Sequence, residues 1–189
     1  NHVLAGEDVI ENAIYSYGDN LDIVPSQPLM HFTSLDSHQV LTELIEPLKK
    51  NYDYIFFDCA PSMSLLSINC LIAARFLITP IESAFLSLDG LNDLTNTLAD
   101  IQKHYKVKIS FLGVVANMVD WRNRLTHEVF VQLAKHFPKK VFKNTIPRNV
   151  RLAEAPSHGL PIALYDPNCA GACAFEKLST ELKRKINKE

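Results

Sequence analysis

Glycine is scarce in this chain, with only 6 among the 189 residues. A phosphate-binding loop needs glycines so that backbone N–H groups can wrap the phosphates, followed by a lysine and a serine or threonine. None of the glycines here is followed by lysine. The sequence as written therefore contains no phosphate-binding loop of this kind.

Long apolar runs and a strong net charge are also absent. No uninterrupted apolar stretch approaches the length of a membrane span, and residues 1–20 show no basic segment followed by a short apolar one. The net charge is −2, with 47% hydrophobic and 21% charged residues, which is typical of a soluble globular domain with a sizeable core. We expect a cytoplasmic protein. Because the first residue is asparagine rather than methionine, we also expect a piece of a longer or processed chain.

The cysteines give no sign of a metal site. There are 4 of them, and Cys169 and Cys173 lie four positions apart without a matching His or Cys pair elsewhere. In a cytoplasmic domain we expect all of them to be reduced and packed, without a chemical role.

Predicted strands and helices alternate along the chain. Apolar residues at helical spacing indicate the helices, and short apolar runs indicate the strands. Strands that are separated by helices form right-handed βαβ units, so we predict an α/β fold with a mostly parallel sheet in a single domain over residues 1–189. The predicted helices are 6–17, 37–51, 65–74, 88–104, 126–137 and 170–188, and the predicted strands are 21–25, 52–58, 76–80, 109–116 and 141–143.

The stretch NYDYIFFDCAPS, residues 51–62, holds the first candidate functional residue. Its run 54–57 is apolar throughout rather than alternating, which is typical of a strand buried on both faces of a parallel sheet. Asp58 follows at the carboxyl end of that strand, the edge where ligands bind in open parallel sheets. An aspartate there can hold Mg²⁺ or its water in a P-loop nucleotide hydrolase, but it can equally cap the helix that begins near Leu65.

Polar residues also follow the other predicted strands. The side-chain amide of Asn117 can offer a donor and an acceptor to a planar heterocycle such as adenine, although a turn or a helix cap is an equally good use for it. The residues at these strand ends are Pro80, Glu82, Asn117, Asp120, Pro147, Arg148 and Asn149.

The last predicted helix has a narrow apolar stripe between lysines and arginines. A membrane-surface helix and a helix docked on the sheet both fit this pattern, and the mixed charges favour docking. The stripe consists of Phe175, Leu178, Leu182 and Ile186.

Four segments carry a family resemblance. They are YDYIFFDCAPSMSLLSINCLIAA, TPIESAFLSLDGL, GVVANMVDWRN and NTIPRNVRLAEAPSHGLPIALYDPNCAGA. Together they resemble the ParA/Soj chromosome- and plasmid-partitioning ATPases of the MinD/ParA superfamily. The similarity runs from residue 20 to the last helix, and residues 146–167 are its most specific part.

The resemblance implies a three-layer P-loop NTPase-like fold with a mostly parallel sheet flanked by helices. Family members carry, ahead of the matching part, a first strand, a deviant Walker A loop of the KGGVGKTT type and a second strand with the switch aspartate. The sequence contains none of these elements. We therefore expect the C-terminal portion of a longer ATPase domain, which would be inactive on its own.

One group of site residues implied by the resemblance surrounds the predicted strand 52–58. Asp58 matches the catalytic Walker B aspartate, which holds Mg²⁺ through water, and Pro61 and Ser62 begin the segment that senses the γ-phosphate. Two positions depart from the family pattern: Ala60 replaces a proline, and Ser64 replaces a glycine, which we expect to stiffen this segment.

A second group of implied residues follows the later strands. Asn117 falls at the base-recognition position for ATP or ADP, and Pro147 with Arg148 lies where family members contact adenine. Arg122 and Arg151 match positions that bind DNA without sequence preference once ATP has built the dimer. An ordinary solvated basic face is the alternative for the arginines and for the lysines that follow them.

The function that these features predict is a ParA-type ATPase in chromosome or plasmid partitioning. It would form an ATP-dependent homodimer, bind DNA on the nucleoid and release it after hydrolysis stimulated by a ParB-like partner, without binding a membrane. Two alternatives stay open. One is a MinD-like membrane-cycling ATPase, and the other is a non-enzymatic DNA-binding or scaffold domain without a P-loop.

Overall fold

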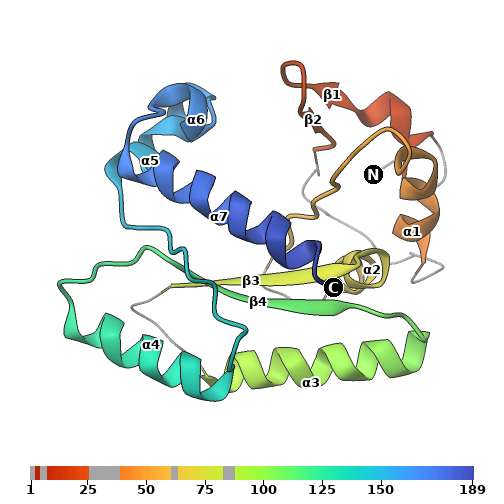
Figure 1. The fold of residues 1–189 in the computed structure, drawn as a ribbon. Coiled ribbons are helices and arrows are strands. Elements are labelled where there is room, and N and C mark those ends of the chain that lie inside the picture. The colour runs from red at the N-terminus through yellow and green to blue at the C-terminus, as the bar shows by residue number, and fades with distance from the viewer. Residues whose placement is uncertain (1–2, 5–7, 26–38, 61–63, 83–87) are drawn as a thin grey trace. The chain divides into compact units, whose positions relative to one another are not determined.

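The computed structural model describes residues 3–4, 8–25, 39–60, 64–82 and 88–189 (Figure 1). The chain divides into two compact units, Asn1–Arg75 with Ile101–Ile109, and Phe76–Asp100 with Ser110–Glu189. A single domain over residues 1–189 stays a prediction.

The first unit begins with a small hairpin. A 3-10 helix, Ile10–Ala13, leads into strand β1, Tyr15–Ser16, which pairs antiparallel with β2, Asp22–Ile23. The predicted helix 6–17 is therefore wrong in its described part. Gly18 adopts a left-handed φ of 72° between the strands, and this turn directs the chain into a hairpin.

Two helices of the first unit follow the prediction more closely. Helix α1, Val40–Ile45, continues as a 3-10 turn, Glu46–Leu48, because Pro47 cannot extend the α-helical hydrogen bonding. Positions 37 and 38 of the predicted helix lie outside the described residues. Helix α2, Leu65–Ala73, confirms the predicted helix 65–74.

The predicted strand 52–58 is wrong. Residues 54–60 have no regular secondary structure, and no strand among the described residues pairs with them. Burial also differs from the prediction, since Tyr54 is 44% and Phe56 73% exposed. A continuous apolar run indicates an extended segment, but a strand also needs a hydrogen-bonded neighbour.

The second unit contains the parallel sheet. Strand β3, Phe76–Glu82, pairs in parallel with β4, Ser110–Asn117, and helix α3, Leu88–Tyr105, lies between them in the chain. Val141 and Pro147 form single parallel bridges to Val114 and Val119, so the predicted strand 141–143 is reduced to one bridge. Parallel strands linked by helices confirm the α/β class.

Helices cover both faces of this sheet (Figure 1). On one face, helix α4, Arg124–His136, packs Val129 and Leu133 against Val114 of β4. On the other, Leu112 and Val115 meet helix α7, Ala170–Ile186. Two short helices that are not among the predicted ones, α5 (Val150–Glu154) and α6 (Ile162–Tyr165), precede α7.

Gly113 allows a close backbone approach in β4. Its φ is 138°, and a Cβ atom built there would lie 1.8 Å from the carbonyl oxygen of Lys140. Val114 N–H donates to that same carbonyl at 2.7 Å. The segment before Val141 can therefore reach β4 only because position 113 has no side chain.

The docked interpretation of the last helix is confirmed for most of its stripe. Leu178, Leu182 and Ile186 pack against the Leu112 cluster, together with Ala174. Phe175 is 44% exposed, so its place in the stripe was wrong. None of the described helices is both long and apolar enough to span a membrane.

Candidate functional site

The carboxyl edge of β3 and β4 gathers three of the predicted nucleotide-binding residues. Asn117 ends β4 and lies opposite Glu82, the last residue of β3. Beyond β4, the N–H of Ile146 donates to the carbonyl of Ala116 at 2.9 Å, and the N–H of Arg148 donates to that of Val119 at 3.1 Å. These bonds bring Pro147 and Arg148 to the edge that Asn117 occupies.

The amide of Asn117 is available at this edge. The residue is half-buried, and within the described ranges its side chain makes no hydrogen bond. The alternative role of a helix cap belongs to other asparagines: Asn123 accepts the N–H of Leu125 at the start of α4, and Asn149 accepts that of Arg151 at the start of α5. This arrangement favours ligand binding over capping for Asn117.

Arg148 lies among carboxylates at the same edge. Its guanidinium is 3.8 Å from Oε1 of Glu82, and its positive charge also helps to lower the pKa of Asp120. The Arg148 side chain is 68% exposed, so its partners restrain it without burying it. A flat guanidinium in this position can stack on a base or contact a phosphate.

Arg122 is held by Asp120 in the turn after β4. Its Nε lies 2.9 Å from Oδ1 and its second guanidinium nitrogen 2.7 Å from Oδ2, while its backbone N–H also donates to Oδ1. These hydrogen bonds lower the pKa of Asp120 to about 2. The Arg122 side chain is 91% exposed, so a DNA phosphate could reach it. To bind Arg122, that phosphate would have to displace the carboxylate of Asp120.

Arg151 is paired in a similar way. One guanidinium nitrogen lies 2.9 Å from Glu154, and Nε lies 3.4 Å from Asp166. Hydrogen bonding and charge from Arg151 lower the pKa of Glu154. Both predicted DNA contacts are therefore preoriented by acids, and any DNA binding through them involves exchange of a carboxylate for a phosphate.

A buried carboxylate supports the chain that leads to Pro147. Glu181 of α7 is 4% exposed and accepts the N–H of Lys143 and the N–H and side-chain amide of Asn144, at 2.9, 2.9 and 2.7 Å. Burial raises the pKa of Glu181, but these hydrogen bonds outweigh it, and the net direction is downward. The ionised carboxylate thus fixes residues 143–144 to the last helix.

Asp58 belongs to the first unit and is exposed at the end of the extended segment 54–58. Pro61 and Ser62 lie outside the described residues. Ser64 has a φ of −73° and caps α2 by accepting the N–H of Ser67 at 3.2 Å. Because this φ is not left-handed, position 64 does not require the glycine that the family pattern has there.

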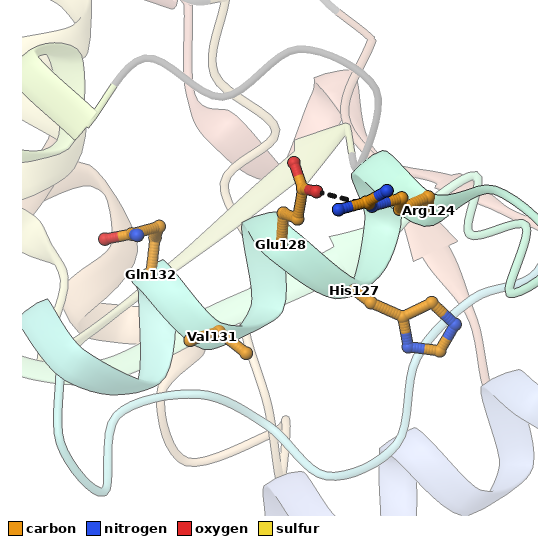
Figure 2. A pocket seen from close by; sticks show the side chains of 5 residues that line it. All are labelled: Arg124, His127, Glu128, Val131 and Gln132. Atoms are coloured by element: carbon orange, nitrogen blue, oxygen red, sulfur yellow. Dashed lines mark hydrogen bonds and ion pairs between the residues drawn. The ribbon is translucent and has the colours of Figure 1, made fainter.

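A hollow on the outer face of α4 does not include any predicted site residue. Figure 2 shows its lining, in which Arg124 and Glu128 form an ion pair of 3.1 Å. The remaining side chains are His127, Val131 and Gln132. All five come from one helix and none from the strand edge, so we assign this hollow no ligand.

Sequence reasoning missed three structural partners. Glu82 was noted only as a residue near the end of the predicted strand 76–80, and its pairing with Arg148 joins segments far apart in the chain. Asp120 and Arg122 are two positions apart, a spacing that signals a turn with a side-chain ion pair. Glu181 falls between Leu178 and Leu182 on the apolar side of α7, where an acid signals a buried acceptor.

The fold defines an α/β protein with a parallel sheet covered by helices, and comparisons with known proteins identify the family. The model of the AAA domain family matches residues 1–111. The chain is 40% identical over 181 residues to the sporulation initiation inhibitor protein Soj of Bacillus subtilis, covering 93% of this chain and 72% of that protein. It is 34% identical over 189 residues to the chromosome partitioning protein ParA of Caulobacter vibrioides, covering 95% and 71%.

A solved structure supports the same fold. Cobyrinic acid a,c-diamide synthase from Mycobacterium smegmatis, crystallised with an ATP analog and magnesium, matches with a TM-score of 0.78 at 21% identity, over 97% of this chain and 70% of that one. The chain belongs to the ParA/Soj family of partitioning ATPases and has its P-loop ATPase-type α/β fold.

Proposed function

We propose that this chain acts in chromosome or plasmid partitioning as part of a ParA-type ATPase whose ATP-bound dimer binds DNA. The observation that carries the proposal is that Asn117, Pro147 and Arg148 lie at one strand edge. Within the described residues, the side-chain amide of Asn117 makes no hydrogen bond and can therefore face a ligand. The Soj and ParA relatives supply the cellular process.

ATP and Mg²⁺ fit the side chains of this chain in part. Asn117 has the donor and acceptor that an adenine edge needs, with Pro147 and Arg148 beside it. The exposed Asp58 carboxylate is an oxygen ligand of the kind that Mg²⁺ or its bound water prefers. When bound, Mg²⁺ would neutralise charge on the phosphates. Pro61 and Ser62 would begin the segment that senses the γ-phosphate. The phosphate-wrapping glycines are not in the sequence, so we expect no hydrolysis by the 189-residue chain alone.

DNA binding through Arg122 and Arg151 would be independent of sequence and sensitive to salt. The γ-phosphate would order the segment after Asp58 and hold two subunits together, and hydrolysis stimulated by a ParB-like protein would remove that support. Such a cycle would keep the protein on the nucleoid while ATP is bound.

The first test is to read the encoding gene upstream of Asn1. An in-frame segment containing Gly-Lys-Thr favours the ATPase, whereas a start codon close to Asn1 favours a scaffold domain without a P-loop. Magnesium-dependent ATP turnover by the 189-residue chain would overturn the expectation that it is inactive.

The second test measures nucleotide binding by the complete gene product. Asn117→Ala should weaken binding of a fluorescent ATP analogue about tenfold, because a base hydrogen bond contributes on the order of 1–2 kcal/mol. Gln132→Ala, on the exposed face of α4, is the matched control and should bind as the wild type does. Equal affinity of all three proteins would refute the role of Asn117.

A further inference from the structure

The end of α7 and the turn after α4 meet at the amino end of β4 (Figure 1). Lys185 of α7 joins them, because its Nζ donates to the carbonyl of Lys139 at 3.4 Å and to that of Leu112 in β4 at 3.2 Å. At the same end, the hydroxyl of Ser110, the first residue of β4, donates to Glu189 at 2.8 Å. These contacts bring two stretches that are distant in the sequence together where β4 begins.

The two stretches, residues 135–143 and 181–189, carry many cations and few acids. The first contains no Asp or Glu, and in the second Glu181 is buried and accepts the N–H groups of Lys143 and Asn144. Within these ranges only Glu189 is left as an exposed acid. The cations, which we call the basic surface, are Lys135, Lys139, Lys140, Lys143, Lys183, Arg184, Lys185 and Lys188.

Most cations of the basic surface are directed to solvent. Lys139, Lys143, Arg184 and Lys188 are exposed, and their side chains form no ion pair with a described residue. Lysines in the last turn of a helix can complement its dipole, but Lys139 and Lys143 lie outside the helices, so this role does not account for them. The surface therefore has positive charge that the protein itself does not neutralise.

The cations of the basic surface also repel one another. Burial lowers the pKa of Lys185, and the positive charges of Lys140 and Arg184 lower it further, against the opposing effect of Glu181. Lys140 has a carboxylate nearby, since its Nζ lies 3.9 Å from Oε1 of Glu189. An anionic polymer that binds here would relieve the remaining repulsion.

We propose that the basic surface is a second binding site for duplex DNA, separate from the arginines beyond the other end of β4. A phosphate backbone fits it better than a lipid surface, because stable membrane attachment needs apolar side chains to insert as well as positive charge. Leu182 and Ile186, the apolar residues in this part of α7, are packed against the cluster of Leu112 and cannot insert.

The two proposed DNA sites are too far apart to act as one. Arg122 and Arg148 lie beyond Asn117, at the carboxyl end of β4, whereas the basic surface lies beside Ser110 at the amino end. The 8 residues of β4 span about 23 Å at about 3.3 Å per step. Salt at physiological concentration screens charges over about 8 Å, so each site has its own field. A protein with both sites can therefore join two DNA segments.

The test is a bridging assay with the complete gene product and ATP, and it rests on the DNA binding proposed above. A biotinylated duplex on beads captures the protein, and a fluorescent duplex of unrelated sequence is then added at about 0.15 M salt. The double variant Arg184→Gln with Lys188→Gln should capture at least about tenfold less of the second duplex. Its salt slope for that duplex should fall by about 2, because two phosphate contacts are lost.

Two further double variants are the controls. Lys49→Gln with Lys50→Gln removes the same charge from exposed positions of the first unit and should bridge as the wild type does. Arg184→Lys with Lys188→Arg keeps both charges and should also bridge, because phosphate contacts of this kind depend on charge rather than on one side-chain shape. Both positions are exposed, so none of these variants should lose the fold.

Three outcomes would overturn the second site. One is bridging by Arg184→Gln with Lys188→Gln that equals the wild type, and another is an equal loss in the Lys49 and Lys50 control. The third is binding of phosphatidylglycerol vesicles that the Arg184 and Lys188 variant loses, without any bridging of DNA, which would assign the surface to lipid. If the protein does not bind even the first duplex, the proposed DNA binding fails as well, so the two failures are distinguishable.

Discussion

The buried carboxylate of Glu181 should stabilise the second unit by an amount that depends on pH. Glutamine at this position keeps one acceptor oxygen, but its NH₂ group replaces the other oxygen. That NH₂ group would face a backbone N–H that donates to the carboxylate in the wild type. The loss is one charge-assisted hydrogen bond and one donor left without an acceptor, which costs about 1–3 kcal/mol. Alanine removes all three hydrogen bonds and should cost about 3–5 kcal/mol.

The sign of the pH dependence follows from the lowered pKa of Glu181. A carboxyl group that is more acidic in the folded state stabilises that state above its unfolded pKa, near the ordinary value of 4.5. This stabilisation is lost as the pH falls through the lower folded pKa. The difference in unfolding free energy between wild type and Glu181→Gln should therefore be full at pH 7 and shrink in acid below pH 4.5.

Urea unfolding at several pH values measures this difference, and hydrogen exchange at the amides of Lys143 and Asn144 reports the same change locally. Glu176→Gln is the matched control, since Glu176 lies on the exposed side of the same helix and its replacement should cost less than about 0.5 kcal/mol. If Glu181→Gln is as harmless as this control, or if its cost is unchanged in acid, the assigned role of the carboxylate is wrong.

Three other predictions concern the second unit. Gly113→Ala should lower the free energy of unfolding, measured in urea, by about 3 kcal/mol or more, because its Cβ would lie 1.8 Å from the Lys140 carbonyl oxygen. The control Gly159→Ala has a left-handed φ but open space around the new Cβ, and it should cost about 1–2 kcal/mol. Equal costs would contradict the close approach at Gly113. Asp120→Asn should release Arg122 and raise the DNA affinity of the complete protein at low salt. Glu176→Gln removes the same charge from α7 and should raise the affinity less. An equal effect of the two substitutions would argue against Arg122 as a phosphate contact. The docked α7 should keep the chain from sedimenting with phosphatidylglycerol-containing vesicles, and sedimentation would revive the membrane alternative.

The sequence pattern predicts the second unit better than the first, and the reason lies in the partners of each element. The run ending at Asn117 forms β4 as expected, and its Val114 and Ala116 residues are fully buried. Residues 54–57 have the same apolar pattern but no paired strand among the described residues. A local pattern indicates an extended conformation, whereas hydrogen-bonded neighbours come from elsewhere in the fold.

The candidate site shows a similar division. The positions of Asn117, Pro147 and Arg148 at one strand edge follow from strand order, which alternating elements predict. The two-position spacing of Asp120 and Arg122 signals their pairing, whereas the pairing of Arg151 with Asp166 could not be assigned, because it depends on the path of the chain between them.

The most direct test of the account is DNA binding by the complete gene product with and without ATP, at two salt concentrations, for the wild type, Arg122→Ala and Arg151→Ala. We predict binding only with ATP, a steep loss at the higher salt, and for each substitution weaker binding with a salt slope reduced by about 1. DNA binding that does not depend on ATP and is unchanged by both substitutions would contradict a partitioning ATPase that binds DNA through these arginines. The fold assignment would not be affected.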